Sequence, residues 1–183
     1  EPMHRDSVLK LLQAHGVRAE SGREAEMIVA TIAFVTAQSD CLLRTCVPGH
    51  LTGSAWIVSP DRAQVLLTHH RKLDKWLQLG GHADGDPDLL AVAWREAREE
   101  SGLANVRVTA PEIFDLDRHW IPERKQEPVH FHYDLRFVFE ADPREPLAIT
   151  HESKDLAWVA LDRVTGLNSE ESMARMVRKT RRA

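Results

Sequence analysis

One segment, residues 80–103, constrains the fold of this chain more than any other. It begins with a glycine pair and ends with the run Arg-Glu-Ala-Arg-Glu-Glu-Ser-Gly-Leu at residues 95–103. Asp86 is a good N-cap, Pro87 is suited to the first helical position, and Gly102 is a typical residue to end a helix. The sequence therefore predicts a helix over residues 87–101.

This predicted helix is apolar on both of its sides. One side carries Leu89, Val92 and Ala93, and the other carries Leu90, Trp94 and Ala97. A helix with two apolar sides packs against neighbours on both. We therefore expect its polar residues to lie at the rim of a buried surface.

Three glutamates share one face of the helix. Glu96, Glu99 and Glu100 stand at positions i, i+3 and i+4, which brings their carboxylates together. Like charges at this spacing repel, whereas Mg²⁺ and Mn²⁺ prefer carboxylate oxygens as ligands. The pattern indicates a metal site; the alternative is a solvated acidic patch that Arg95 and Arg98 partly offset.

Composition narrows the class of protein. The 183 residues suit one domain with some additions, and 43% are hydrophobic and 28% charged, as in ordinary globular proteins. The net charge of −4 gives no overall attraction to nucleic acid, and no apolar run approaches the ~18 residues of a membrane span. Cys41 and Cys46 lack the spacing of a redox or zinc motif. We expect free thiols and a cytoplasmic protein with no membrane or nucleic-acid partner.

The chain divides into a helical extension and a main domain. Helices are predicted over residues 4–15 and from a cap at Ser21 to about residue 38, followed by a loop over residues 41–53. We expect residues 1–45 to form an N-terminal helical extension packed on the core and residues 46–183 to form the main domain.

Strands and helices mix within the main domain. Residues 55–58 and 64–68 read as a hairpin, and residues 130–139 alternate as a half-buried strand with a polar face near its start. A further strand near residues 157–159 and a helix over residues 169–178 complete the chain. Because no regular βαβ period is present, we expect an α+β fold with a mixed sheet flanked by helices.

The glutamate segment resembles the Nudix box, G-x5-E-x7-R-E-U-x-E-E-x-G-U, in which U is apolar. Gly81 matches the first position, and residues 95–103 match every specified position of the second half. One position departs, because Pro87 stands where the pattern has its first glutamate, with Asp86 and Asp88 beside it. The order of elements from about residue 53 to residue 178 also resembles the Nudix fold, a mixed sheet sandwiched between helices.

This resemblance implies a metal-dependent hydrolase that cleaves the pyrophosphate linkage of a nucleoside diphosphate derivative by water attack at phosphorus. It implies Mg²⁺ or Mn²⁺ as cofactor, with Glu99 and Glu100 as the principal metal ligands and Glu96 as a further ligand. Arg95 would orient a glutamate by a charge-assisted hydrogen bond. The partner is a small nucleotide-type substrate, and a homodimer is left open.

Other site residues are predicted around the box. Glu152, which precedes a predicted strand, is the first candidate for the general base and Glu100 the second; the alternative for Glu152 is a plain surface acid. Gly80 and Gly81 would bend tightly beside the metal, or form an ordinary turn.

Histidines accompany the box in sequence, at positions 69, 70, 82, 119, 130 and 132. His82 could reach a phosphate, while His130 and His132 share a strand face and could line the substrate pocket. Structural roles are the alternative for each. Because no H-E-x-x-H or Cys/His spacing is present, we expect substrate contacts rather than a zinc site.

Two other functions share this fold. A nucleotide-binding Nudix sensor without catalysis would account for Pro87 in the box. An isomerase of the isopentenyl diphosphate type is a third candidate, but Cys41 and Cys46 both precede the first predicted strand, so neither stands in a convincing catalytic context.

Overall fold

The structure is a computed structural model that describes residues 2–20 and 22–182. Ser21, the predicted cap of the second helix, lies outside the described residues. The helices are η1 Pro2–Arg5, α1 Asp6–Gly16, α2 Arg23–Ala37, α3 Leu89–Ser101, η2 Leu161–Arg163, α4 Val164–Leu167 and α5 Glu171–Arg182. The strands are β1 Gly49–Val58, β2 Gln64–His70, β3 Lys75–Leu77, β4 Leu79–His82, β5 Arg107–Val108, β6 Asp115–Ile121, β7 His130–Glu140 and β8 Ser153–Ala160.

The chain forms two compact units, which are described separately. The first unit comprises Glu1–Ser54, Gly81–Ala93 and Pro111–Phe137; the second comprises Ala55–Gly80, Trp94–Ala110 and Val138–Ala183. Strands β1, β4 and β7 and helix α3 contribute residues to both units. The division predicted near residue 45 stays a prediction.

Strand pairing follows the order β3-β2-β1-β7-β5, with β4 paired to β1, β6 to β7 and β8 to β2. The β6–β7 pair is antiparallel and runs from Asp115↔Arg136 to Ile121↔His130. The β2–β8 pair is also antiparallel, with Gln64↔Ala160 at one end. Together with the helices, this sheet confirms the predicted α+β class. None of the helices formed by the described residues has both the length and the apolarity that crossing a membrane requires.

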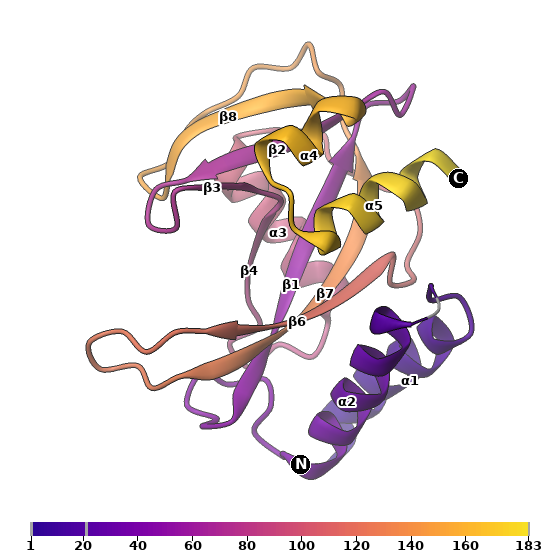
Figure 1. Cartoon of the computed structure of the whole chain (residues 1–183), viewed down its shortest axis with the longest axis vertical. Helices are drawn as coiled ribbons and strands as arrows, with labels where there is room; N and C mark the ends of the chain where they lie inside the picture. The colour runs from indigo at the N-terminus through magenta and orange to yellow at the C-terminus, as the bar shows by residue number, and fades with distance from the viewer. Residues whose placement is uncertain (1, 21, 183) are drawn as a thin grey trace. The chain divides into compact units, whose positions relative to one another are not determined.

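In the first unit, α1 packs on α2, and α2 packs on β6 (Figure 1). A buried glutamate joins these elements: Glu24 Oε2 lies 3.0 Å from Nε2 of His15 on α1 and accepts the backbone N–H of Leu116 on β6. The Phe34 ring of α2 stacks on Tyr133 of β7 with centroids 4.1 Å apart. The second of the two predicted N-terminal helices therefore packs on strands of this unit, and the first packs on the second.

In the second unit, α5 is held to β1 by a buried polar contact. Trp56 is fully buried, and its Nε1–H donates to Thr180 Oγ1 at 2.8 Å. Figure 1 shows α5 following the short helix α4 at the C-terminal end of the chain. Because an indole N–H needs an acceptor when buried, this bond fixes the register of α5 on the strand.

Strand β1 corrects one prediction. The sequence predicts a loop over residues 41–53, but β1 begins at Gly49. Gly49 is required by close packing rather than by a turn, because a Cβ at this position would lie 2.4 Å from the carbonyl oxygen of Phe131. A glycine in a strand often marks such a close backbone approach.

Helix α3 begins two residues later than predicted. Asp88 Oδ1 accepts the N–H of Ala91 at 3.0 Å, so Asp88 rather than Asp86 is the N-cap. Asp86 instead caps the preceding turn by accepting the N–H of Asp88. The helix ends at Ser101 as predicted, and Gly102 adopts a φ of 74°, the left-handed conformation that favours glycine.

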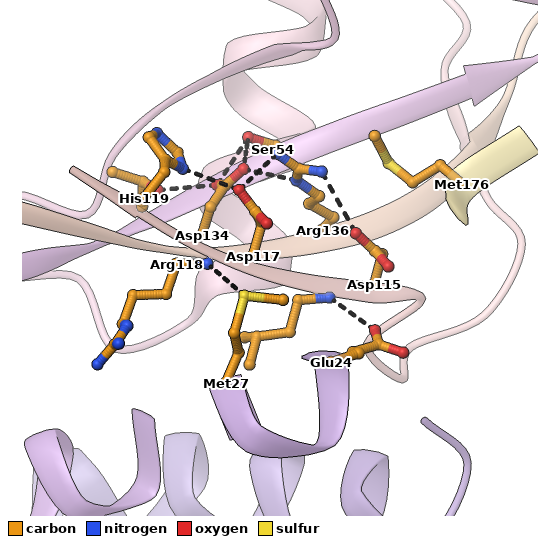
Figure 2. A network of polar contacts seen from close by, with 12 residues as sticks. Glu24, Met27, Ser54, Asp115, Asp117, Arg118, His119, Asp134, Arg136 and Met176 are labelled. Atoms are coloured by element: carbon orange, nitrogen blue, oxygen red, sulfur yellow. Dashed lines mark hydrogen bonds and ion pairs between the residues drawn. The ribbon is translucent and has the colours of Figure 1, made fainter. Parts of the chain in front are cut away.

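The polar face of β7 is buried, whereas the sequence predicts a half-buried strand. Asp134 and Arg136 are 1% and 3% exposed. Figure 2 shows their network: Arg136 Nε–H donates to Asp134 at 2.8 Å, and the guanidinium also contacts Asp115 and Asp117. Burial alone would lower the pKa of Arg136, but the three carboxylates raise it above its ordinary value. Ion pairing therefore allows this polar face to enter the core.

Candidate functional site

The second unit brings together the glutamates of α3 and of the loop before β8. Glu96 is half-buried, Glu99 is exposed and Glu100 is only 9% exposed. The side chains of Glu96 and Glu100 are hydrogen-bonded to each other, and the charge of Glu152 acts on both. Four carboxyl groups predicted as site residues thus belong to one neighbourhood.

Burial has the largest effect on the pKa values of Glu96 and Glu100. Burial and, to a smaller extent, the neighbouring Glu96 and Glu152 together raise the pKa of Glu100 to about 9, against a backbone hydrogen bond from Gly80. Burial also raises the pKa of Glu96. With a pKa of about 9, Glu100 keeps its proton at neutral pH and can donate it to Glu96. A divalent cation can replace that proton, because it compensates the same crowded negative charge.

Arg71, which the sequence analysis did not select, positions the loop that carries Glu152. The Arg71 backbone N–H donates to the Glu152 carbonyl at 2.9 Å. Its guanidinium donates to the carbonyls of His151 and Ser153, at 3.1 and 3.3 Å. The residue stands in a basic run at the end of β2, but only the pairing of β2 with β8 brings it to this loop.

Arg95 acts electrostatically on the carboxyls of α3, whereas the glycine pair forms part of a strand. Arg95 is exposed, and its charge lowers the pKa of Glu96, against the larger effect of burial. A hydrogen bond from Arg95 to a glutamate stays a prediction. Gly80 and Gly81 lie in β4, so the predicted tight bend is wrong. They follow the strand because β4 pairs with β1, and Gly80 contributes a backbone hydrogen bond to Glu100.

The first unit brings together the predicted histidines His82, His130 and His132, and it adds one that the sequence analysis missed. The four-histidine cluster consists of His50 on β1, His82 at the end of β4, and His130 and His132 on β7. The His50 ring centroid lies 5.1, 4.9 and 4.8 Å from those of the other three. The alternation of His50, Thr52 and Ser54 is the signal that could have found it, since it matches His130, His132 and Asp134 on the paired strand.

Three imidazoles of this cluster, those of His50, His82 and His132, have lowered pKa values and are held neutral. Burial and neighbouring histidines lower the pKa of His132 to about 2 and that of His50 to about 4. The pKa of His82 is lowered as well, chiefly by burial. Neutral imidazoles keep a ring nitrogen lone pair available as an acceptor or as a ligand.

Both cysteines are buried free thiols, as predicted. Burial raises the pKa of Cys41 to about 11 and that of Cys46 to about 12. A thiol is a nucleophile mainly as the thiolate. Neither residue is therefore prepared for catalysis.

Comparison with known proteins decides the family. A family model described as the NUDIX domain matches residues 50–180, more than half of the chain. The chain belongs to the Nudix family. No curated protein sequence matches it significantly. The predicted class of Nudix pyrophosphohydrolase is confirmed, and enzymes of this family generally use divalent metal ions.

Solved structures share the fold at low sequence identity. The dihydroneopterin triphosphate pyrophosphohydrolase of E. coli is 15% identical, with a TM-score of 0.59 over 73% of this chain and 96% of that one. The Ap4A hydrolase of C. elegans is 14% identical, with a TM-score of 0.56 over 72% and 95%. A NUDIX-family hydrolase from Clostridium perfringens is 23% identical, with a TM-score of 0.51 over 72% and 96%.

Proposed function

We propose that this Nudix domain hydrolyses the pyrophosphate linkage of a nucleoside diphosphate derivative with Mg²⁺, or Mn²⁺ in its place. The observation that carries the proposal is the hydrogen-bonded pair of carboxyls, Glu96 and Glu100, with the charge of Glu152 acting on both. A chain gains no stability from such crowding by itself. Oxygen ligands of this kind suit a hard divalent cation.

Glu96, Glu99 and Glu100 would hold the cation. When bound, it neutralises charge on the phosphate oxygens and activates the attacking water. Pro87 does not interrupt this set, because it precedes the first residue of α3 and so lies outside the helix that carries the three glutamates. Arg95, whose charge acts on Glu96, would orient that carboxylate.

Glu152 is the general base in this proposal. A base must be ionised, and the raised pKa of Glu100 makes that residue a poor base until a cation displaces its proton. Glu152 is exposed, and the Arg71 guanidinium donates hydrogen bonds to the backbone carbonyls on either side of it. It would take a proton from water as the water oxygen bonds to phosphorus and the bridging P–O bond breaks, which leaves two phosphate products.

The test is a panel of nucleoside diphosphate derivatives incubated with the purified chain in Mg²⁺, in Mn²⁺ and in EDTA. We expect release of a nucleoside monophosphate in the first two conditions only, with ¹⁸O from labelled water in one phosphate product. Cleavage at equal rates in EDTA, or ¹⁸O in a non-phosphate product, would contradict the proposal.

The Nudix sensor is the second candidate, because Pro87 replaces the first glutamate of the box. Tight nucleotide binding by calorimetry with no turnover in either metal would favour it. The helical extension over residues 1–45, the cytoplasmic location and a homodimer also stay predictions.

A further inference from the structure

The four-histidine cluster has a ligand geometry of its own, which the proposed hydrolysis does not use. It belongs entirely to the first unit. Three of its members, His50, His130 and His132, each offer one ring nitrogen, and these nitrogens all lie within 4.8 Å of one another. Its members come from three strands, so the fold rather than local sequence assembles it.

One pair of ring nitrogens has the spacing of metal ligands. His130 Nε2 and His132 Nε2 are 3.3 Å apart. Two nitrogens bound tetrahedrally to zinc, each at about 2.0–2.1 Å, stand about 3.3–3.4 Å from each other. A single ion can therefore bind both nitrogens without moving them apart.

The tautomer of His130 aims a lone pair into the cluster. His130 Nδ1–H donates to the carbonyl of Pro128 at 2.8 Å, and a carbonyl can only accept. In the neutral ring the proton is thus on Nδ1 and the lone pair on Nε2, the atom that faces His132. A backbone carbonyl that fixes the free N–H of a histidine is the usual outer support of a metal ligand.

His50 supplies the independent observation. It is 4% exposed, and neither of its ring nitrogens has a hydrogen-bond partner among the described residues. A buried ring N–H or lone pair without a partner is destabilising, so such groups are rare in folded proteins and require an explanation. Coordination to an ion shared with the other histidines would satisfy one nitrogen.

We propose that the four-histidine cluster binds a divalent transition-metal ion, with Zn²⁺ as the first choice. Neutral imidazole suits zinc and its neighbours, whereas Mg²⁺ demands oxygen ligands. His50, His130 and His132 are the ligands that the nitrogen geometry supports, and His82 lies beside them, with its ring centroid 5.1 Å from that of His50 and 5.2 Å from that of His132. Asp84 and Glu127 act on His82 as negative charges, although Asp84 is also paired with Arg44 at 2.8 Å. A bound ion would link β1 and β7. In this proposal His82, His130 and His132 line a metal site, whereas the sequence predicts that they contact substrate.

The test separates this site from the carboxylates of the second unit. Untagged protein is stripped with a chelator, reloaded with Zn²⁺ in excess Mg²⁺, and desalted, and its zinc content is measured. We expect one zinc per chain in the wild type, in the control His69→Ala and in Glu99→Gln, and its loss in His50→Ala and His132→Ala. Unchanged zinc in both cluster variants, or loss of zinc in Glu99→Gln, would overturn the proposal.

X-ray absorption of the zinc-loaded wild type tests the site without any substitution. We expect a nitrogen shell at about 2.0 Å with the multiple scattering of at least three imidazole rings. A shell of carboxylate oxygens, or one without imidazole scattering, would refute the proposal even if the histidine variants fail to fold. Neither measurement depends on hydrolysis, so failure here and failure of the proposed function are distinguishable.

Discussion

The buried carboxyl of Glu100 should make the metal-free protein lose stability as the pH rises. Its pKa is about 9 in the folded chain, against 4.5 for the ordinary group. Between pH 6 and pH 8, Glu100 is therefore ionised in the unfolded chain but protonated in the folded chain. A raised folded pKa gives stability that is present below the ordinary pKa and is lost as the pH rises, by about 1.4 kcal/mol per pH unit for one proton.

Glu100→Gln isolates this effect, because glutamine has nearly the same shape and does not titrate. From pH 6 to pH 8 in EDTA, the free energy of unfolding of the wild type should fall by about 2–3 kcal/mol relative to the variant. Urea denaturation at pH 6, 7 and 8 measures this difference, and the titrations of histidines cancel in it. Saturating Mg²⁺ should remove the pH dependence. Parallel pH profiles for the two proteins would refute the reasoning.

Three further substitutions follow from the structure. Gly102→Ala should lower the free energy of unfolding, measured by urea denaturation, by about 1–3 kcal/mol, because φ is 74° and a Cβ would lie 2.7 Å from another side-chain carbon. Gly22 has a similar φ, but a Cβ there would meet no neighbouring atom, so Gly22→Ala should lower the free energy of unfolding by less. Arg136→Met removes the positive charge that three buried aspartates share and should cost about 3–5 kcal/mol by the same assay. Arg144→Ala, at an exposed ion pair, should change stability by under about 1 kcal/mol. Arg71→Ala should lower kcat about 10-fold or more with little change in the thermal midpoint, because it frees the backbone around Glu152; an unchanged kcat would remove Arg71 from the site.

The sequence predicts best where local chemistry decides the structure. The end of α3 at Ser101 follows from Gly102, and the shared face of three glutamates follows from their spacing alone. The start of α3 was predicted two residues early, because Asp86 and Asp88 are equally good caps in isolation. Only the hydrogen bond that Asp88 accepts from Ala91 distinguishes them.

Long-range packing accounts for what the sequence could not predict. Gly49 is predicted as a loop residue, because the sequence does not reveal that the backbone of Phe131 passes close to it. The burial of the polar face of β7 could not be predicted, because Arg136 pairs not only with Asp134 on its own strand but also with Asp115 on β6. His50 and Arg71 gain their roles from strand pairing, which joins residues about 80 positions apart.

The most direct test of the account is the metal dependence of pyrophosphate cleavage by matched variants. For the substrate that the panel identifies, initial rates are measured against Mg²⁺ concentration for the wild type, Glu99→Gln and Glu100→Gln, with Glu112→Gln as a control outside α3. We expect the two helix variants to lose at least about 100-fold in kcat and to need more Mg²⁺, while the control keeps the wild-type curve. Full activity in both helix variants, at the same Mg²⁺ concentrations as the wild type, would contradict the assignment of this helix as the metal site.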